Sequence, residues 1–252
     1  LEEKKLLIRT TLEYLKGSDV KVIAGTGSND TAESVELSRW ASEQGVAGVL
    51  LATPYYNKPS QAGLLAHFKA VADAVSCEVM LYNVPGRSGV SIAPETVVEL
   101  AAHERIRSLK EASGNPVITS EIRDLLQAKG RSIDILSGDD ATFLPCLSVG
   151  AVGVVSVASN LFPRAMKEIH SRFEKGDAAG ARAVHDKYYP LFRDLFVETN
   201  PVPIKAALAH AGLGHADVRL PLAPLAANSV KILQHSLARC GISAGVFERK
   251  SL

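Results

Sequence analysis

A regular alternation of short apolar runs with longer stretches of helical periodicity constrains the fold of this chain most strongly. Short runs bounded by turn residues are typical of buried strands, and strands that alternate with single helices form right-handed βαβ units in a parallel sheet. The pattern therefore predicts an α/β fold. The six predicted strands are Val20–Ala24, Gly48–Ala52, Val79–Tyr82, Arg105–Lys110, Ile133–Leu136 and Gly153–Val157.

The stretches between these runs carry the signals of helix ends. Asp30 and Glu33 have the D-x-x-E spacing of a capping box at a helix start, and Gly17 stands where a first helix would stop. The predicted helices are Leu1–Lys16, Asp30–Gln44, Gln61–Val75, Pro94–Ala102, Pro116–Lys129, Ala141–Val149 and Pro163–Lys175.

Six strands are compatible with two architectures. A doubly wound open sheet can be built from six strands, whereas a closed (β/α)₈ barrel, the TIM barrel, requires eight. An open dinucleotide-binding sheet would place G-x-G-x-x-G after its first strand, but Gly25-Thr-Gly27 has no third glycine at the required position. The sequence therefore favours a (β/α)₈ barrel whose first two strands precede Leu1.

The pattern changes to helices alone from about Ala178. Residues 178–198, 203–211 and 224–239 have helical periodicity, with breaks at Asn200-Pro201 and Leu220-Pro221. We therefore expect three parts: a β/α barrel over residues 1–177 that is incomplete at its N-terminus, a C-terminal helical domain over 178–242, and a tail over 243–252.

Composition excludes several classes of protein. The net charge of +1 across 252 residues, 22% of them charged, gives no electrostatic basis for a nucleic-acid partner or an anionic membrane. Cys77, Cys146 and Cys240 are far apart and form no CxxC, which argues against a disulfide framework or a zinc site. No apolar run reaches membrane-spanning length. These properties predict a cytoplasmic protein without a structural metal.

Lys110 is the most informative candidate for chemistry. Reactive residues of parallel barrels lie at the carboxyl ends of the strands, and alternation places Ile106, Ser108 and Lys110 on one face. Desolvation in a barrel mouth would favour the neutral amine, which attacks carbonyl carbons. The alternative is a lysine paired with a neighbouring carboxylate. Arg107 fits poorly, because alternation directs it toward the helices.

Three further residues follow predicted strands. Tyr82 could move protons near an imine, although a buried tyrosine with a satisfied hydroxyl is the simpler interpretation. Arg87, on a Pro-Gly turn, could bind a carboxylate in a bidentate manner or could simply be solvated. Gly138, before Asp139 and Asp140, could belong to a site or to a turn that caps the next helix.

Six segments in a fixed order carry a resemblance to a known family. They are TPYYNKPSQAGLLAHFKA (Thr53–Ala70), YNVPGRSG (Tyr82–Gly89), KEASGN (Lys110–Asn115), LSGDD (Leu136–Asp140), GVVSVASN (Gly153–Asn160) and FVETNPVPIK (Phe196–Lys205). From Leu1 to about Ile242 the chain resembles the dihydrodipicolinate synthases, which belong to the N-acetylneuraminate lyase family of class I aldolases. Each segment alone is shared more loosely with sister aldolases.

The resemblance implies a (β/α)₈ barrel with a C-terminal helical domain. It implies a lyase that condenses pyruvate with L-aspartate 4-semialdehyde through a lysine Schiff base, in the biosynthesis of diaminopimelate and lysine. The covalent imine with pyruvate makes a metal or an organic cofactor unnecessary. The resemblance also implies a homotetramer built as a dimer of dimers.

The resemblance assigns a role to each matching position. Lys110 matches the Schiff-base lysine, Tyr82 the tyrosine that relays protons, and Arg87 the arginine that binds the carboxylate of the aldehyde. Tyr56 matches a tyrosine that reaches across a tight dimer interface into the neighbouring site. The remaining matches are Gly138 and Val155 in the pyruvate pocket, and Asn29, Glu33 and Tyr55 in a pocket where lysine acts as feedback inhibitor. For Tyr55, plain interface packing is the alternative.

One motif of the family has no counterpart. The family carries GTTGE at the end of its second strand, where a threonine links the two tyrosines and backbone amides hold the pyruvate carboxylate. That motif would lie upstream of Leu1, so we expect residues there. A chain without them would expose two unpaired strand edges and would lose the relay. A sister pyruvate-dependent aldolase acting on a sugar acid or keto acid, and a catalytically impaired truncated homologue, are therefore alternatives.

Overall fold

The computed structural model describes residues 1–242, and the predicted tail 243–252 lies outside the described residues. These residues form two compact units. The first consists of Leu1–Gly138 and Val149–Val152, and the second of Asp139–Ser148 and the residues from Gly153 onward. The first unit contains α1 (Glu2–Tyr14), β1 (Ile23–Gly25), α2 (Thr31–Glu43), β2 (Gly48–Ala52), α3 (Gln61–Asp73), β3 (Glu78–Asn83), α4 (Pro85–Ser88), α5 (Pro94–Leu100), β4 (Ile106–Glu111), α6 (Pro116–Ala128) and β5 (Asp134–Ser137).

The sheet of the first unit is parallel and follows chain order. Each strand from β1 to β5 pairs with the next along the sequence, as βαβ units require. All six predicted strands are present, counting one in the second unit, and β2 has the predicted bounds. An α/β fold is therefore confirmed. Residues 1–242 do not contain the eight strands of a closed barrel.

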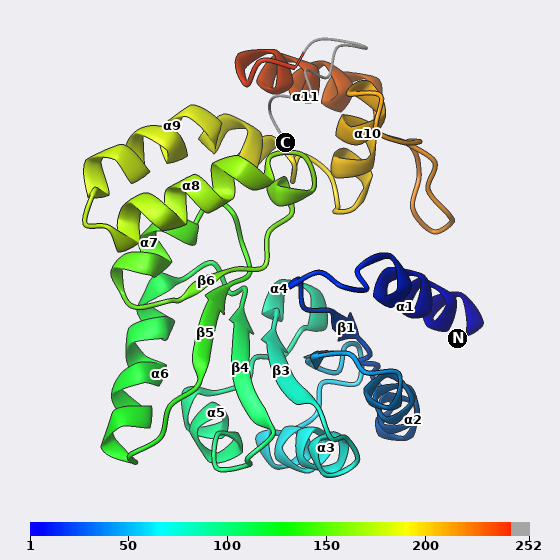
Figure 1. The fold of residues 1–252 in the computed structure, drawn as a ribbon, viewed down its shortest axis with the longest axis vertical. Coiled ribbons are helices and arrows are strands. Elements are labelled where there is room, and N and C mark those ends of the chain that lie inside the picture. The colour runs from blue at the N-terminus through cyan, green and yellow to red at the C-terminus, as the bar shows by residue number, and fades with distance from the viewer. Residues whose placement is uncertain (243–252) are drawn as a thin grey trace. The chain divides into compact units, whose positions relative to one another are not determined.

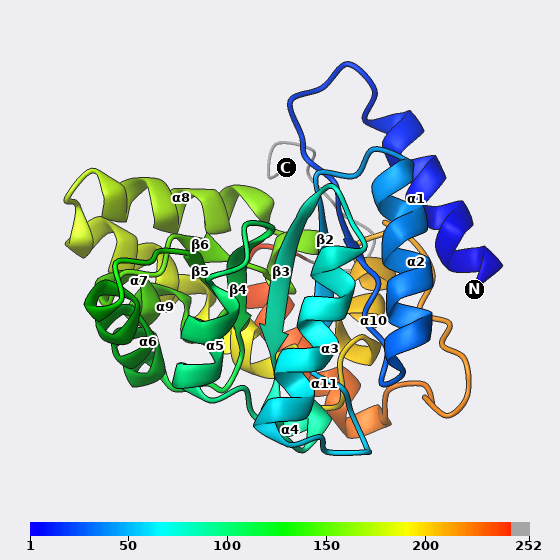
Figure 2. The same cartoon turned by 90° about the horizontal axis from the view of Figure 1, so that it is seen from below.

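The two faces of this sheet differ in packing. Alternate strand residues, among them Val49, Leu51, Val79 and Leu81, belong to one buried core that they share with α2, α3, α5 and α6. These helices lie along one face of the strands (Figures 1 and 2). We call this the helix face. The intervening residues form the site face, where the half-buried side chains are Leu50, Ala52, Tyr82, Lys110 and Leu136.

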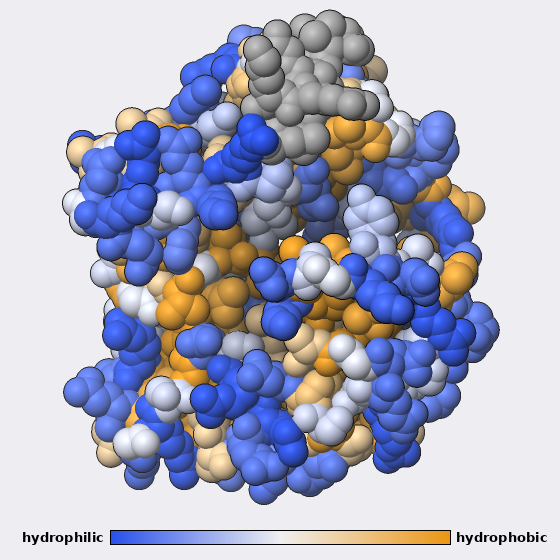
Figure 3. All heavy atoms as spheres, viewed as in Figure 1, coloured by the Kyte–Doolittle hydropathy of each residue, from blue (hydrophilic) through white to orange (hydrophobic). Residues whose placement is uncertain are grey.

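Exposed fractions agree with this division. Leu50 and Leu136 of the site face are half-buried, whereas Val49, Leu51 and Ile135 of the helix face are at most 2% exposed. Over the first unit, a space-filling view shows hydrophobic residues among a largely hydrophilic surface (Figure 3).

The pairing of β3 with β4 contains one irregularity that corrects a prediction. Val79 pairs with Ile106 but Met80 pairs with Ser108, so Arg107 is an extra residue in β4. Ile106 consequently belongs to the core of the helix face rather than to the face of Lys110. The irregularity also accounts for Arg107, which is exposed instead of pointing into that core.

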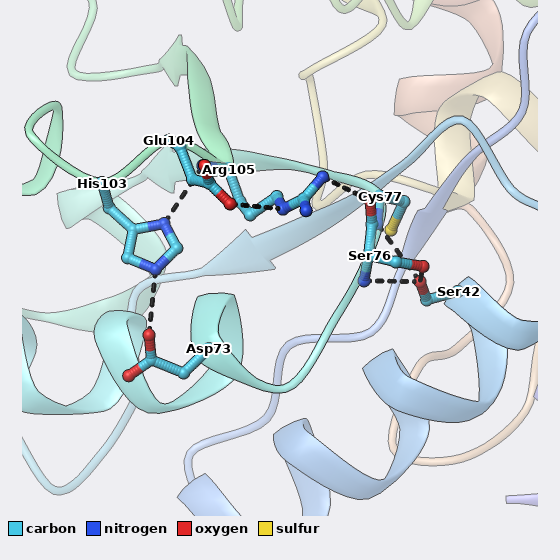
Figure 4. Close-up of polar contacts among 7 residues, drawn as sticks. All are labelled: Ser42, Asp73, Ser76, Cys77, His103, Glu104 and Arg105. Atoms are coloured by element: carbon cyan, nitrogen blue, oxygen red, sulfur yellow. Dashed lines mark hydrogen bonds and ion pairs between the residues drawn. The ribbon is translucent and has the colours of Figure 1, made fainter.

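Hydrogen bonds tie together the segments that precede β3 and β4 (Figure 4). His103 Nδ1 accepts from the Arg105 amide at 3.1 Å, so Nε2 carries the proton and donates to Asp73 at 3.0 Å. The Arg105 guanidinium donates to the Ser76 carbonyl at 2.8 Å, and Ser42 Oγ accepts from the Ser76 amide at 3.0 Å. The starts of both strands are thereby held to α2 and α3, at the ends opposite to Lys110.

The second unit is mainly helical. It contains α7 (Phe143–Ser148), β6 (Gly153–Val154), a 3₁₀ turn at Ala158–Asn160, α8 (Pro163–Glu174), α9 (Ala178–Asp194), α10 (Val202–His210) and α11 (Ala227–Arg239). Side chains of α7 and α8, such as Phe143 and Met166, share a core with Phe192 of α9. The predicted boundary at 177/178 therefore falls inside this unit.

Strand β6 is shorter than predicted, and Asp140 explains the difference. Its Oδ2 accepts from the Val157 amide at 3.0 Å and from the Ala158 amide at 2.8 Å. These amides are consequently not available to a strand ladder. Burial raises the pKa of the Asp140 carboxyl above its ordinary value, while these hydrogen bonds oppose the shift.

In the described part of the chain, no helix is both long and apolar enough to cross a bilayer.

Candidate active site

The site of the first unit centres on Lys110 and Tyr82. The two residues are register partners near the ends of β4 and β3, and both side chains are half-buried. The Lys110 Nζ lies 3.8 Å from the centroid of the Tyr82 ring. The structure thus brings together two residues that the sequence singled out separately. A ring face at this distance attracts an ammonium ion and shields the nitrogen from water on that side.

The hydroxyl of Tyr82 is kept protonated by its surroundings. Burial raises the pKa of the phenol above its ordinary value of 10.0, and the positive charge of Arg87 partly opposes this shift. The Tyr82 carbonyl accepts from both the amide and the hydroxyl of Thr53, at 2.9 and 2.8 Å, which fixes the strand end beneath the ring. A protonated phenol beside an amine can donate a proton to a developing oxyanion.

Gly138 follows β5 and leaves room beside the lysine. A Cβ at this position would lie 2.5 Å from the Ala112 Cβ and 3.1 Å from the Lys110 Cε. Its amide donates to the Glu111 carbonyl at 2.7 Å, which continues the sheet past β5. A side chain at Gly138 would therefore occupy the space beside the lysine. The prediction that Gly138 lines the site stays a prediction, but the close approach supports it.

Arg87 lies in α4, a four-residue helix that the sequence suggested only as a turn. The Ser88 hydroxyl donates to the Val84 carbonyl at 3.0 Å, and Gly89, with φ of +75°, ends the helix. The guanidinium is exposed, yet close enough to Tyr82 to lower the pKa of its phenol. An exposed guanidinium next to a half-buried tyrosine can bind the carboxylate of an entering molecule.

Two residues of the site escaped the sequence analysis. Asn83 and Glu111 directly follow Tyr82 and Lys110, and both are buried. The Asn83 Nδ2 donates to the Glu111 Oε2 at 2.8 Å. In the sequence, both could have been recognised as polar residues at strand positions whose neighbours on the same face, such as Leu81 and Leu109, are apolar.

Tyr55 and Tyr56 point away from the packed part of the first unit. Tyr56 is 90% exposed and Tyr55 46%. Tyr56 also has a φ of +73°, a conformation that residues other than glycine rarely adopt. An exposed aromatic side chain on a constrained backbone is suited to contact another molecule.

The segment before α2 carries the residues predicted for an effector site. Glu33 accepts from the Ser28 hydroxyl at 2.9 Å, and the Asn29 carbonyl accepts from the Asn57 side chain at 2.9 Å. The Asp30 side chain accepts from the Glu33 amide, which confirms the predicted N-cap. The Asn57 bond places Asn29 beside the loop that holds Tyr55 and Tyr56.

Val155 belongs to the second unit, where it follows β6 and is half-buried. Its predicted place in the pyruvate pocket stays a prediction. Within residues 1–242, no three histidine, cysteine, aspartate or glutamate side chains are grouped in a way that could hold a metal ion.

The chain is similar to known proteins in both sequence and structure. A model of the dihydrodipicolinate synthetase family matches residues 1–239. The 4-hydroxy-tetrahydrodipicolinate synthase of Trichlorobacter lovleyi is 49% identical over 92% of this chain and 79% of its own length. The solved synthase from Methylacidiphilum fumariolicum SolV superposes with a TM-score of 0.92 at 48% identity, covering 95% of this chain and 79% of that one.

A third relative was solved with a small molecule. The synthase from Acinetobacter baumannii, in complex with pyruvate, has a TM-score of 0.90 and 38% identity, over 96% of this chain and 81% of its own. With its lysine and tyrosine side by side at the ends of parallel strands, the chain belongs to the dihydrodipicolinate synthetase family.

Proposed function

We propose that this chain is a 4-hydroxy-tetrahydrodipicolinate synthase, a lyase that condenses pyruvate with L-aspartate 4-semialdehyde on the route to diaminopimelate and lysine. The observation that carries the proposal is the Lys110 amine, 3.8 Å from the Tyr82 ring and beside the space that Gly138 leaves open. An amine held at a strand end, partly shielded from water, is the group that class I aldolases use.

In the proposed reaction, the neutral Lys110 amine attacks the C2 carbonyl carbon of pyruvate. The C–O bond breaks, water leaves, and a C=N bond to the lysine forms. Loss of a proton from the methyl group gives an enamine, whose carbon attacks the aldehyde carbon. The aldehyde oxygen takes up a proton and the C=N bond to the lysine forms again. Attack of the substrate's own amine on the imine carbon then breaks the bond to Lys110 and releases the product. Tyr82 supplies and accepts protons during these steps, and the raised pKa of its phenol keeps the hydroxyl in its protonated form before the reaction starts. The imine supplies the electron sink, so no metal or organic cofactor is proposed.

The other predicted residues have roles in binding. Arg87 binds the carboxylate of the aldehyde, because its exposed guanidinium stands next to Tyr82. Gly138 and Val155 line the pyruvate pocket. Tyr56 has a catalytic role instead: it reaches into the site of a second copy, where its hydroxyl takes part in the proton transfers, and its 90% exposure supports such a contact.

The finer features of the architecture belong to the same proposal. The active enzyme is a closed (β/α)₈ barrel in a cytoplasmic homotetramer, assembled as a dimer of dimers. A pocket for lysine at the dimer interface includes Asn29, Glu33 and Tyr55. The hydrogen bond from the Asn57 side chain to the Asn29 carbonyl supports this grouping, because it brings Asn29 beside the loop of Tyr55. A carboxylate such as Glu33 suits the amines of lysine.

The proposal is tested by trapping the imine. The protein is incubated with pyruvate and sodium borohydride, digested, and mapped by mass spectrometry. A reduced adduct on Lys110 is expected. The absence of an adduct on Lys110 would overturn the function and would favour the impaired homologue.

A Lys110→Ala variant separates chemistry from folding. We expect the variant to lose the adduct while its thermal unfolding stays close to that of the parent, because polar residues at strand ends of barrels serve chemistry more than stability. Lys129→Ala, an exposed lysine after α6, is the control and should keep the adduct. A large loss of stability with trapping retained would contradict the assignment.

The substrate is tested by comparing two activities in one preparation. Condensation with L-aspartate 4-semialdehyde is measured against retro-aldol cleavage of sugar acids. Faster condensation is expected, because Arg87 is suited to a second carboxylate. Faster cleavage of a sugar acid would assign the chain to a sister aldolase.

A further inference from the structure

The buried side chains of Asn83 and Glu111 are hydrogen-bonded to each other, one position along the strands from Tyr82 and Lys110. Asn83 is 1% exposed and Glu111 6%. The two are register partners at the ends of β3 and β4, one position beyond Tyr82 and Lys110. The side chains of a strand alternate between its faces, so the pair occupies the helix face while Tyr82 and Lys110 occupy the site face.

Three hydrogen bonds hold the side chains of this pair. Asn83 Nδ2 donates to Glu111 Oε2 at 2.8 Å, and Asn83 Oδ1 accepts from the Ile92 amide at 3.0 Å. Glu111 Oε1 accepts from the Ser113 amide at 2.6 Å. A buried carboxylate without partners would be costly, and these bonds offset that cost.

Backbone bonds at the same residues join three strands. The Asn83 carbonyl accepts from the Ala112 amide at 2.9 Å, and the Glu111 carbonyl accepts from the Gly138 amide at 2.7 Å. The pair therefore fixes the end of β4 against β3 through side chains and against the end of β5 through the backbone.

The bond to Ile92 reaches the segment that carries Arg87. Residues 84–92 leave β3, form α4 and return to the core at Ile92, which is 2% exposed. The segment begins directly after Asn83, and its end at Ile92 is held by the hydrogen bond from the Ile92 amide to Asn83 Oδ1. The position of Arg87 relative to Lys110 thus depends on the Asn83–Glu111 pair.

We propose that Asn83 and Glu111 are positioning residues that set the distance between Arg87 and Lys110, and so the use of the aldehyde. The inference rests on the proposed function, because it assumes that Lys110 holds pyruvate and Arg87 holds the aldehyde. Neither member of the pair is assigned a contact with substrate.

Single substitutions of the pair leave one polar contact mismatched. In Glu111→Gln, the NH₂ group of the new amide faces a second donor, either Asn83 Nδ2 or the Ser113 amide. If the Asn83 side chain rotates so that its oxygen faces the glutamine, its NH₂ group then faces the Ile92 amide, so two donors still oppose each other. In Asn83→Asp, two carboxylate oxygens face each other, and like charges repel.

The double substitution Asn83→Asp with Glu111→Gln restores every bond. The aspartate would accept from the Ile92 amide with one oxygen and from the glutamine Nε2 with the other. The glutamine Oε1 would accept from the Ser113 amide. The charge moves to the neighbouring strand while the pattern of contacts is kept, so a double-mutant cycle isolates the contacts from the charge.

Three measurements separate positioning from general destabilisation. For each single variant, kcat/KM for the aldehyde should fall about 100-fold, since a displacement of about 1 Å can have that effect. The rate of borohydride trapping with pyruvate should fall by a smaller factor. Amide hydrogen exchange at residues 84–92 should accelerate. The double variant should regain most of kcat/KM and of exchange protection.

Each outcome decides one point. A double variant as impaired as the singles, or one that fails to fold, would overturn the proposal, as would singles with parental kcat/KM. Glu99→Gln, an exposed glutamate on α5, is the matched control and should leave all three measurements unchanged. If the parent protein forms no adduct on Lys110, the proposed function fails, whereas hydrogen exchange at residues 84–92 still tests the positioning role.

Discussion

At the scale of single residues, side chains that are proposed to carry chemistry alternate with side chains that hold the sheet together. Tyr82 and Lys110 lie on the site face, and Asn83 and Glu111 lie on the helix face one position later. The alternation of a strand makes this division possible, because adjacent residues enter different environments. Roles in chemistry and in structure can therefore be tested separately at neighbouring positions.

Arg87→Ala should damage one substrate more than the other. We expect a large fall in kcat/KM for the aldehyde and little change in trapping of pyruvate on Lys110, because the guanidinium is proposed to bind the second carboxylate. Arg87→Lys keeps the charge but loses the bidentate geometry, so it should recover only part of the loss. Steady-state kinetics with both substrates makes the comparison. Equal damage to both substrates would refute this role for Arg87.

Gly138→Ala should lower stability and activity together. Its Cβ would lie 2.5 Å from the Ala112 Cβ, and overpacking of this kind costs about 1–3 kcal/mol in the free energy of unfolding. Adding Ala112→Gly removes that contact, so denaturant unfolding should recover. Activity should recover less, because the new Cβ still lies 3.1 Å from the Lys110 Cε. Full recovery of activity would argue against a site beside Gly138.

The residues differ in how far the sequence could identify them. Lys110 and Tyr82 could be predicted because a polar residue at the end of an apolar strand is conspicuous, and the structure places them together. Ile106 was assigned to the wrong face, because the extra residue in β4 changes the alternation and depends on pairing with β3. The contact between Asn83 and Glu111 could not be predicted, since it requires the register of the two strands.

At the scale of elements, bounds were predicted well where local signals are strong. Strand β2 begins at Gly48 and ends at Ala52, as its apolar run indicates. Strand β6 ends early because Asp140, distant in sequence, takes the amides of Val157 and Ala158. The helix α4 was missed, since four residues give too short a window for periodicity.

The contact between α2 and α3 should depend on pH through His67. Its Nδ1 lies 2.9 Å from the Thr31 hydroxyl, the ring is 5% exposed, and burial lowers the pKa of the imidazole below 6.5. A lowered pKa in the folded state means that stability is complete above about pH 6.5 and is lost as the pH falls below it. Each unit of pKa difference corresponds to about 1.4 kcal/mol.

We therefore expect the free energy of unfolding to fall between about pH 7 and pH 5, by urea titration. His67→Gln should weaken this dependence, whereas His215→Gln, an exposed residue, should leave it unchanged. An unchanged slope in His67→Gln would show that the imidazole is not responsible.

At the scale of the whole molecule, the division into units was harder to predict than the elements. The change from strands to helices near residue 178 suggested a boundary there, but α7 and α8 share a core with α9. Membership of a core depends on tertiary packing, which local periodicity does not report.

The proposed assembly can be tested by mixing two inactive variants. Lys110→Ala lacks the nucleophile, and Tyr56→Phe lacks a hydroxyl that is proposed to act in the neighbouring site. After dissociation and joint reassembly, a mixed dimer would contain one site with both groups intact. Condensation activity should therefore appear in the mixture and not in either variant alone. A mixture that stays inactive, with mixed dimers shown by native mass spectrometry, would contradict the exchange of Tyr56.

The extra residue in β4 lets two contacts of this strand exist together. Ile106 packs into the core of the helix face and Lys110, four residues later, lies on the site face, although strict alternation would place both on one face. Because Arg107 stands opposite no residue of β3, its deletion would leave Ile106 opposite Val79 and Lys110 opposite Tyr82, so the amine would keep its side of the sheet. A regular strand that retained Arg107 would instead turn either the isoleucine out of the core or the amine into it. The bulge thus allows a strand of this length to serve the apolar interior and the site at once.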